Sequence, residues 1–271
     1  MNSLTEEELD SLPLKELIQR MDDFLLESNK ERYGQLHLGF TIPLPSDLIN
    51  TISVQGKTES EIRKIAYLVF SYLVQLELSS VSSGISNKIL FTKNYKPLDW
   101  TSPTFRLRSS SINQYQIICS RIAFEIFVDL LYCIENGERL ASKKSKLKKF
   151  RAWLQDVNNR FHYFAHVLLI AYRFDREIRT PEVHGSSSSP RNMLMLQIPT
   201  SEEMNKQFRL TNTLVNVWQS LIDILNNTRP TYMNIITPAD NEWFQVYMSG
   251  NDEAIEAKLD EMLGSVENDG I

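Results

Sequence analysis

SINQYQIICSRIAFEIFVDLLYCIEN, residues 111–136, is the stretch that decides the fold class. It contains no glycine or proline, and its apolar side chains fall at nearly every angle around a helix, which is typical of a helix buried on most sides. Ser109–Ser111 can open this helix, and Gly137 suits the left-handed conformation that often follows a helix end. We therefore expect this segment at the centre of a helical bundle.

Helix-start signals also precede the amphipathic segments on either side of this stretch. In each case a threonine stands three residues before a glutamate, the capping-box pattern that closes the first turn of a helix. Apolar residues at helical spacing then follow. The three patterns begin at Thr5, Thr58 and Thr200. They predict one helix ending near residues 28–30, a second that stops before Gly84 and a third that ends before Pro230.

Other segments carry breakers instead of a helical period. Residues 85–108 contain Pro97 and Pro103 and show no clear repeat, so we expect a long loop there. A helix is expected from Ser142 onward, with a break at Asn158–Asn159 before a second helical stretch. These breaks set the limits of the predicted helices on both sides of the central segment.

The predicted fold class is all-α, a multi-helix bundle with long loops and a small helical C-terminal appendage. The chain has 271 residues, of which 42% are hydrophobic and 23% charged, as expected for an ordinary globular domain. We expect residues 1–230 to form the bundle. Residues 231–271 are expected to form the appendage, packed on the same domain.

The sequence predicts a cytoplasmic protein with no membrane partner. The first residues, MNSLTEEELD, lack the basic and apolar regions of a secretory signal. No apolar run reaches the roughly 18 residues that a membrane-spanning helix needs. The two cysteines, Cys119 and Cys133, lie in one predicted helix about 21 Å apart, too far for a disulfide between them. We therefore expect both to be reduced core residues.

Charge is unevenly distributed along the chain. The total is −5, yet residues 105–179 carry 14 Lys and Arg against 7 Asp and Glu, a net of +7. The segments before and after carry −4 and −8. A basic middle between acidic ends allows an anionic partner at the middle segment. It equally allows the acidic ends to fold onto the basic middle, and the sequence leaves both open.

The densest part of this positive charge lies on a predicted helix. In a nucleic-acid-binding role the cations would hold phosphates while Phe150 or Trp153 stacks on a base. The alternative is a solvated helix face with Leu147, Phe150 and Leu154 turned inward. The candidate nucleic-acid-binding residues are Lys143, Lys144, Lys146, Lys148, Lys149 and Arg151.

Histidines are the next candidates, because the chain has no glycine-rich phosphate loop, no CxxC and no HExxH motif. His162 and His166 are four residues apart, about 6 Å on one helix face, and could bind a transition metal if a third ligand joined them. That ligand could be Asp175, Glu182 or His184. The alternative is two partly buried histidines without a metal, and the leading prediction includes no metal and no cofactor.

Arginine followed at short spacing by histidine occurs twice. Five residues separate Arg160 from His166, and four separate Arg179 from His184. On these residues the chain resembles the HEPN (higher eukaryotes and prokaryotes nucleotide-binding) family, over about residues 105–185. The resemblance implies an all-α bundle that acts on RNA as a metal-independent endoribonuclease. It also implies a homodimer in which the motifs of both subunits face one cleft.

The chemistry of RNA cleavage gives these residue types a role. Histidine can accept and donate protons near neutral pH, and arginine can stabilise the charge that develops on the phosphate. On an unbroken helix Arg160 and His166 would point roughly 120° apart. Arg179 and His184 flank a proline in a predicted loop, where a turn can bring them together. This second pair is therefore the better candidate.

One further charged pair, Arg121 and Glu125, lies four residues apart on the apolar central helix. It is either an internal salt bridge or part of the Arg/His site. The leading hypothesis is a protein that binds or processes RNA. The alternatives are a non-enzymatic, self-associating interaction protein and a metal-dependent hydrolase using His162 and His166. The candidate catalytic residues are Arg179, His184, Arg160, His166, Arg121 and Glu125.

Overall fold

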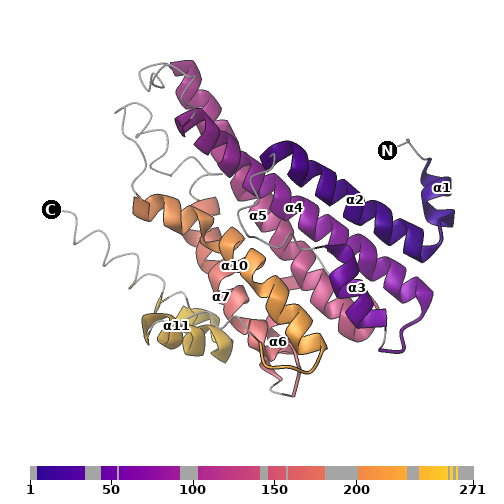
Figure 1. The fold of residues 1–271 in the computed structure, drawn as a ribbon. Helices are drawn as coiled ribbons and strands as arrows, with labels where there is room; N and C mark the ends of the chain where they lie inside the picture. The colour runs from indigo at the N-terminus through magenta and orange to yellow at the C-terminus, as the bar shows by residue number, and fades with distance from the viewer. Residues whose placement is uncertain are drawn as a thin grey trace.

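The structure is a computed structural model, and it describes residues 5–33, 44–53, 55–91, 103–140, 146–156, 158–180, 201–230, 238–255, 257–258 and 261. Within these ranges every regular element is a helix, which confirms the all-α prediction. The helices form a multi-helix bundle (Figure 1). None of the helices in the described ranges is long and apolar enough to cross a membrane.

Two long helices run side by side through the middle of the bundle, α4 (Glu59–Phe91) and α5 (Pro103–Asn136) (Figure 1). The capping box predicted at the start of α4 is present, because the Glu61 carboxylate accepts hydrogen bonds from the backbone N–H and hydroxyl of Thr58. Gly137 follows the end of α5 with a φ of 75°, the left-handed conformation expected there.

The central position of α5 is confirmed, although this helix is not buried on every side. Phe124, Phe127 and Leu131 are almost completely buried, and the Phe127 ring packs against Tyr72 of α4. On another side of α5, apolar side chains at positions i, i+3 and i+7 remain 39–48% exposed. These exposed residues are Tyr115, Ile118 and Ile122.

The first predicted helix is in fact two helices, α1 (Glu6–Ser11) and α2 (Leu14–Tyr33). The predicted capping box forms at Thr5, but Leu12 adopts an extended conformation before Pro13. A residue before proline is sterically driven out of the helical region, and proline is well tolerated immediately before a new helix. The proline therefore divides the segment, and the apolar period alone did not indicate this break.

The loop predicted over residues 85–108 is wrong at both of its ends. The backbone of α4 continues through Gly84 to Phe91, and α5 already begins at Pro103. Glycine inside a helix costs only about 1 kcal/mol relative to alanine, which packing between α4 and α5 can offset. Proline at the first position of a helix is favourable, so Pro103 starts α5 and does not interrupt a helix.

The remaining helices cover the flanks of this central pair (Figure 1). α2 and α3 (Pro45–Ser53) lie on one side, where an Asp22 carboxylate oxygen accepts a hydrogen bond from the Ser46 N–H. α10 packs across α7, α3, α5 and α4, and the Tyr72 hydroxyl donates to the Leu214 carbonyl of α10 at 2.6 Å. The elements of the other flank are α6 (Lys146–Gln155), the 3-10 helix η1 (His162–Phe164), α7 (Ala165–Phe174), the π-helix η2 (Asp175–Arg179), α10 (Ser201–Leu225) and α11 (Pro238–Ser249).

Candidate anion-binding site

The break predicted at Asn158–Asn159 is observed and separates α6 from α7. α6 ends at Gln155, and a turn follows in which Asn159 donates a side-chain hydrogen bond to the Trp153 carbonyl. α7 then runs with seven of its ten residues buried. It ends in one π-helical turn, η2, whose five residues are all half-buried and include Asp175, Arg176 and Arg179. Such π turns interrupt helices frequently at functional sites.

Three of the predicted catalytic residues meet around Asp175 at the junction of α5 and η2. Nε of Arg121 lies 2.9 Å from one Asp175 carboxylate oxygen, and Nη1 of Arg179 lies 3.6 Å from the other. Nη2 of Arg121 also lies 3.4 Å from a Glu125 oxygen. The predicted Arg121–Glu125 pair therefore exists. Arg121 forms a shorter ion pair with Asp175, which the sequence suggested only as a metal ligand.

Burial controls the electrostatics of this junction. The Arg121 and Asp175 side chains are only 11% and 18% exposed. Removal from water raises the pKa of Asp175 above its ordinary value, while the nearby Arg121 and Arg179 act in the opposite direction. The guanidinium of Arg121 also lies 5.1 Å from the centre of the Phe124 ring. The junction is thus a charged network inserted into an apolar contact between helices.

Arg160 does not join this network. Its guanidinium lies 2.8 Å from a Glu135 oxygen near the end of α5 and also donates to the Gln55 side chain. Glu135 is 14 residues beyond Arg121 on the same helix, which corresponds to about 21 Å along its axis. The two predicted arginine sites therefore lie at different levels of the bundle, and only Arg179 shares a partner with Arg121.

His166 is a buried residue of α7. Its Nδ1 lies 2.6 Å from the Tyr163 carbonyl, which requires that nitrogen to carry a proton. Its Nε2 is buried without a hydrogen-bond partner among the residues that the structure describes. Burial lowers the pKa of His166, so the neutral ring is favoured. His166 and Arg160 thus contact different groups, although the unbroken helix on which their divergence was predicted is replaced by a turn and η1.

The metal-binding alternative receives no support from the described part of the chain. Nδ1 of His162 lies against the Leu154 carbonyl, and Nδ1 of His166 lies against the Tyr163 carbonyl. Over the residues that the structure describes, no three His, Cys, Asp or Glu side chains are grouped as metal ligands would be. His184 and Glu182 lie outside the described residues, so the predicted Arg179–His184 pair stays a prediction.

Three of the six cations of the basic run lie within ion-pair distance of acidic groups of the same chain. Lys146 Nζ lies 2.8 Å from an Asp129 oxygen, while Lys148 and Arg151 both contact Asp252 just after α11. Arg151 is buried beneath Tyr247, with the guanidinium 5.2 Å from the ring centre. Part of the acidic C-terminal region therefore folds onto the basic middle, one of the two arrangements that the charge pattern allowed.

The aromatic residues of α6 are packing residues. Phe150 is buried, and Trp153 packs against the rings of Phe150, Tyr132 and Phe161. Phe150 and Leu154 point inward, as the alternative to the nucleic-acid role proposed. The Phe150 ring is therefore not accessible for stacking on a base. Lys143 and Lys144 lie outside the described residues, and Lys149 is exposed.

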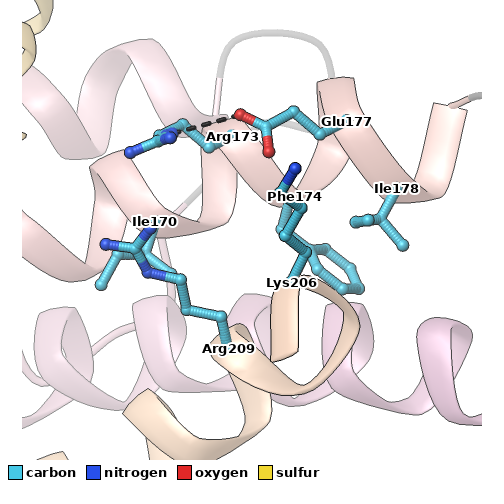
Figure 2. A pocket seen from close by; sticks show the side chains of 7 residues that line it. All are labelled: Ile170, Arg173, Phe174, Glu177, Ile178, Lys206 and Arg209. Atoms are coloured by element: carbon cyan, nitrogen blue, oxygen red, sulfur yellow. Dashed lines mark hydrogen bonds and ion pairs between the residues drawn. The ribbon is translucent and has the colours of Figure 1, made fainter. Parts of the chain in front are cut away.

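A pocket that the sequence did not indicate lies between α7–η2 and α10. Its volume is about 60 Å³. Figure 2 shows Arg173 and Glu177 paired on the α7–η2 side, with Lys206 and Arg209 reaching toward them from α10. Arg173 Nε lies 3.2 Å from a Glu177 oxygen. We call this pocket the α7–α10 pocket. It is lined by Ile170, Arg173, Phe174, Glu177, Ile178, Lys206 and Arg209.

The pocket was missed because its cations come from helices far apart in the sequence. Arg173 and Glu177 could have been identified as an i, i+4 pair at the end of a helix. Lys206 and Arg209 belong to a segment of net negative charge, and only the packing of α10 on α7 brings them to Arg173. The distribution of charge along the sequence therefore predicted a binding site on α6, whereas the cationic pocket lies between α7–η2 and α10.

Comparison with known proteins adds no assignment. No protein-family model, curated protein or solved structure matches this chain. The resemblance to the HEPN family therefore stays a prediction.

Proposed function

We propose that this protein binds RNA through the cationic surface formed by α7, η2 and the first half of α10. The observation that carries this proposal is the convergence of Arg173, Lys206 and Arg209 at one pocket. Arg176 and Arg179 follow at three-residue intervals in η2. Arginine and lysine supply most of the affinity of proteins for the phosphates of nucleic acids.

This surface is a better RNA site than the basic run on α6. On α6 the Lys146, Lys148 and Arg151 side chains are each within ion-pair distance of an acidic side chain, and Arg151 is buried. In the α7–α10 pocket three cations from two different helices converge on one small volume.

The test is fluorescence anisotropy with a labelled single-stranded RNA over a salt series. Replacing Arg173 and Arg209 together with glutamine should weaken binding and reduce the salt slope by about 1.4, the value for two lost phosphate contacts on a single strand. The control is Arg139→Gln, an exposed arginine just beyond the far end of α5. Equal RNA affinity of the double variant and the wild type would contradict the proposal.

The proposal extends to cleavage of the bound RNA, with Arg179 and His184 as the catalytic residues. Arg160 and His166 are poorer candidates, because the two side chains contact different groups and His166 is buried. RNA incubated with the protein should be cut by the wild type and left intact by His184→Ala. Cleavage that continues in both His184→Ala and His166→Ala would eliminate the ribonuclease hypothesis and leave RNA binding untouched.

Self-association is the second candidate function, favoured by the exposed apolar side of α5. Tyr115, Ile118 and Ile122 form a continuous strip, and exposed Gln114 and Glu125 lie at its two ends. An apolar centre with a polar rim is the usual anatomy of a protein interface, and we propose a second copy of this chain as the partner. Sedimentation velocity should show a dimer that Ile118→Glu weakens at least about tenfold. Val215→Glu, at a comparably exposed site on α10, should leave it unchanged.

A further inference from the structure

The C-terminal helix α11 is held on the bundle by few buried side chains. Among the α11 side chains that the structure describes, Tyr247 is buried and the others are half-buried or exposed. By contrast, seven of the ten residues of α7 are buried. Segments with few buried apolar contacts open locally at a small cost in free energy. We therefore expect α11 to leave the bundle more readily than α7.

The chain beyond α11 turns back over α6. Gly250 has a φ of 73°, the left-handed conformation that allows this reversal, and a side chain added there would contact Arg151. Asn251 then caps one helical turn, because its side-chain oxygen accepts hydrogen bonds from two backbone N–H groups of that turn. This local structure places the carboxylate of Asp252 against α6.

Asp252 presents a negative charge to two cations of α6, as a phosphate would. Its carboxylate oxygens lie 3.4 Å from Lys148 Nζ and 3.5 Å from Arg151 Nη2. The Lys148 and Asp252 side chains are both more than two-thirds exposed. Exposed ion pairs add little stability and weaken with salt. An RNA strand, which carries a negative charge on every phosphate, can therefore compete with this single carboxylate.

Tyr247 connects this contact to the charged network at the junction of α5 and η2. The Arg151 guanidinium lies 5.2 Å from the centre of the Tyr247 ring, and that ring packs against Tyr172 of α7. Burial raises the pKa of Tyr247, while the nearby Arg151 and Arg121 act in the opposite direction. Arg121 shares a carboxylate with Arg179 of η2. The cations around Tyr247 therefore extend from α6 to the proposed RNA-binding surface.

We propose that the face of α6 beneath residues 238–255 is a second RNA-binding surface, which this C-terminal segment covers until RNA displaces it. The inference rests on the proposed RNA binding and extends that site from η2 onto α6. In the open form Lys148 and Arg151 bind phosphates. In the closed form Asp252 and Tyr247 occupy their place. The C-terminal segment is thus an autoinhibitory element.

Hydrogen–deuterium exchange of the full chain tests the displacement without any substitution. Single-stranded RNA should speed exchange in residues 238–255 of the wild type while it slows exchange in residues 170–180. A segment that only packs on the bundle would keep its exchange rate or exchange more slowly, because a bound ligand stabilises the folded chain. Unchanged or slower exchange in residues 238–255 would overturn the inference.

Asp252→Lys opens the segment by charge reversal, and Glu253→Lys is its matched control. Both substitutions change the charge equally at exposed neighbouring positions, but within the described residues Asp252 and not Glu253 pairs with α6. Asp252→Lys should bind RNA about fivefold more tightly than Glu253→Lys in fluorescence anisotropy, because a larger open fraction raises the apparent affinity. Equal affinities of the two variants would overturn the second surface.

Exchange in the absence of RNA shows whether the ion pairs hold the segment closed. Residues 238–255 should exchange faster in Asp252→Lys than in Glu253→Lys. Combining Asp252→Lys with Lys148→Asp restores the attraction with the charges swapped, so exchange should return toward the wild-type rate. Equal exchange in Asp252→Lys and Glu253→Lys would show that Asp252 does not hold the segment, and would overturn the inference.

Failure of this inference differs from failure of the RNA function. If RNA slows exchange in residues 170–180 and leaves residues 238–255 unchanged, RNA binding stands and the covered surface on α6 is overturned. If neither the wild type nor Asp252→Lys binds RNA at low salt, the RNA function itself fails, and this inference with it. Binding by Asp252→Lys, with none by the wild type or Glu253→Lys, would uphold both.

Discussion

Arg121 and Arg160 each reach across to a carboxylate on a neighbouring segment, yet their surroundings differ. Arg121 pairs with Asp175 in a contact where both side chains are less than a fifth exposed. Arg160 pairs with Glu135, and both of those side chains are about a third or more exposed. An exposed pair contributes little to stability, whereas a buried one is costly to break. Arg121 is thus tied to the packing of η2 on α5, while Arg160 is a surface arginine.

The comparison predicts its largest effect for Arg121→Ala. Removing this guanidinium leaves the half-buried Asp175 carboxylate with Arg179 as its remaining close cation. We expect the free energy of unfolding to fall by about 3 kcal/mol, measured by urea denaturation at pH 7. The control is Arg20→Ala, which removes an exposed i, i+4 pair with Glu16. A loss no larger than that of the control would show that the junction is not a structural network.

A smaller effect on the free energy of unfolding is expected for Asp175→Asn, and this effect depends on pH. Because burial raises the pKa of Asp175, ionising it is harder in the folded chain than in the unfolded chain. Its stabilising contribution is therefore complete below the ordinary pKa of about 3.9 and is lost as the pH rises through the raised value. The asparagine variant lacks this loss.

The measurement is the free energy of unfolding of both proteins between pH 3 and pH 8, from urea denaturation. Relative to the wild type, Asp175→Asn should become more stable as the pH rises through that window. At pH 7 the free energy of unfolding of the variant should still lie within about 1 kcal/mol of the wild type. The variant loses the ion pairs of Asp175, but it also avoids the cost of burying a charged carboxylate. If the relative stability of the variant fell with rising pH, the arginines and not burial would have the larger influence on the pKa of Asp175.

The sequence predicted the elements better than it predicted the contacts between them. The capping boxes at Thr5 and Thr58 and the buried face of α5 are local patterns, and all were identified. The Arg121–Glu125 pair could also be predicted, because both residues are on one helix. The link from Arg121 to Asp175 required knowing how η2 packs on α5, and no local period carries that information.

The same reason explains why the basic run on α6 was a misleading guide. Six cations in nine residues are conspicuous in the sequence, but an aspartate about a hundred residues away lies against two of them. Lys206 and Arg209 lie in a segment rich in acidic residues and join Arg173 only in three dimensions. Local charge density therefore indicated a run in which three of the six cations contact acidic side chains of the same chain.

The smallest effect in the comparison belongs to Arg160→Ala. Because its ion pair with Glu135 is largely solvated, we expect a loss of only about 0.5 kcal/mol in the free energy of unfolding. The hydrogen bonds to Gln55 join Arg160 to the turn before α4, so a somewhat larger loss would assign them a structural role. RNA affinity should stay within about twofold of the wild type, since an arginine outside the site makes no phosphate contact.

Hydrogen–deuterium exchange with and without single-stranded RNA tests most directly which region binds. If the α7–α10 pocket is the RNA site, exchange should slow in residues 170–180 and 206–210. Residues 133–140 and 158–164, around Glu135 and Arg160, should exchange at the same rate with and without RNA. Protection confined to that second region or to α6, with none at η2 or α10, would contradict the account.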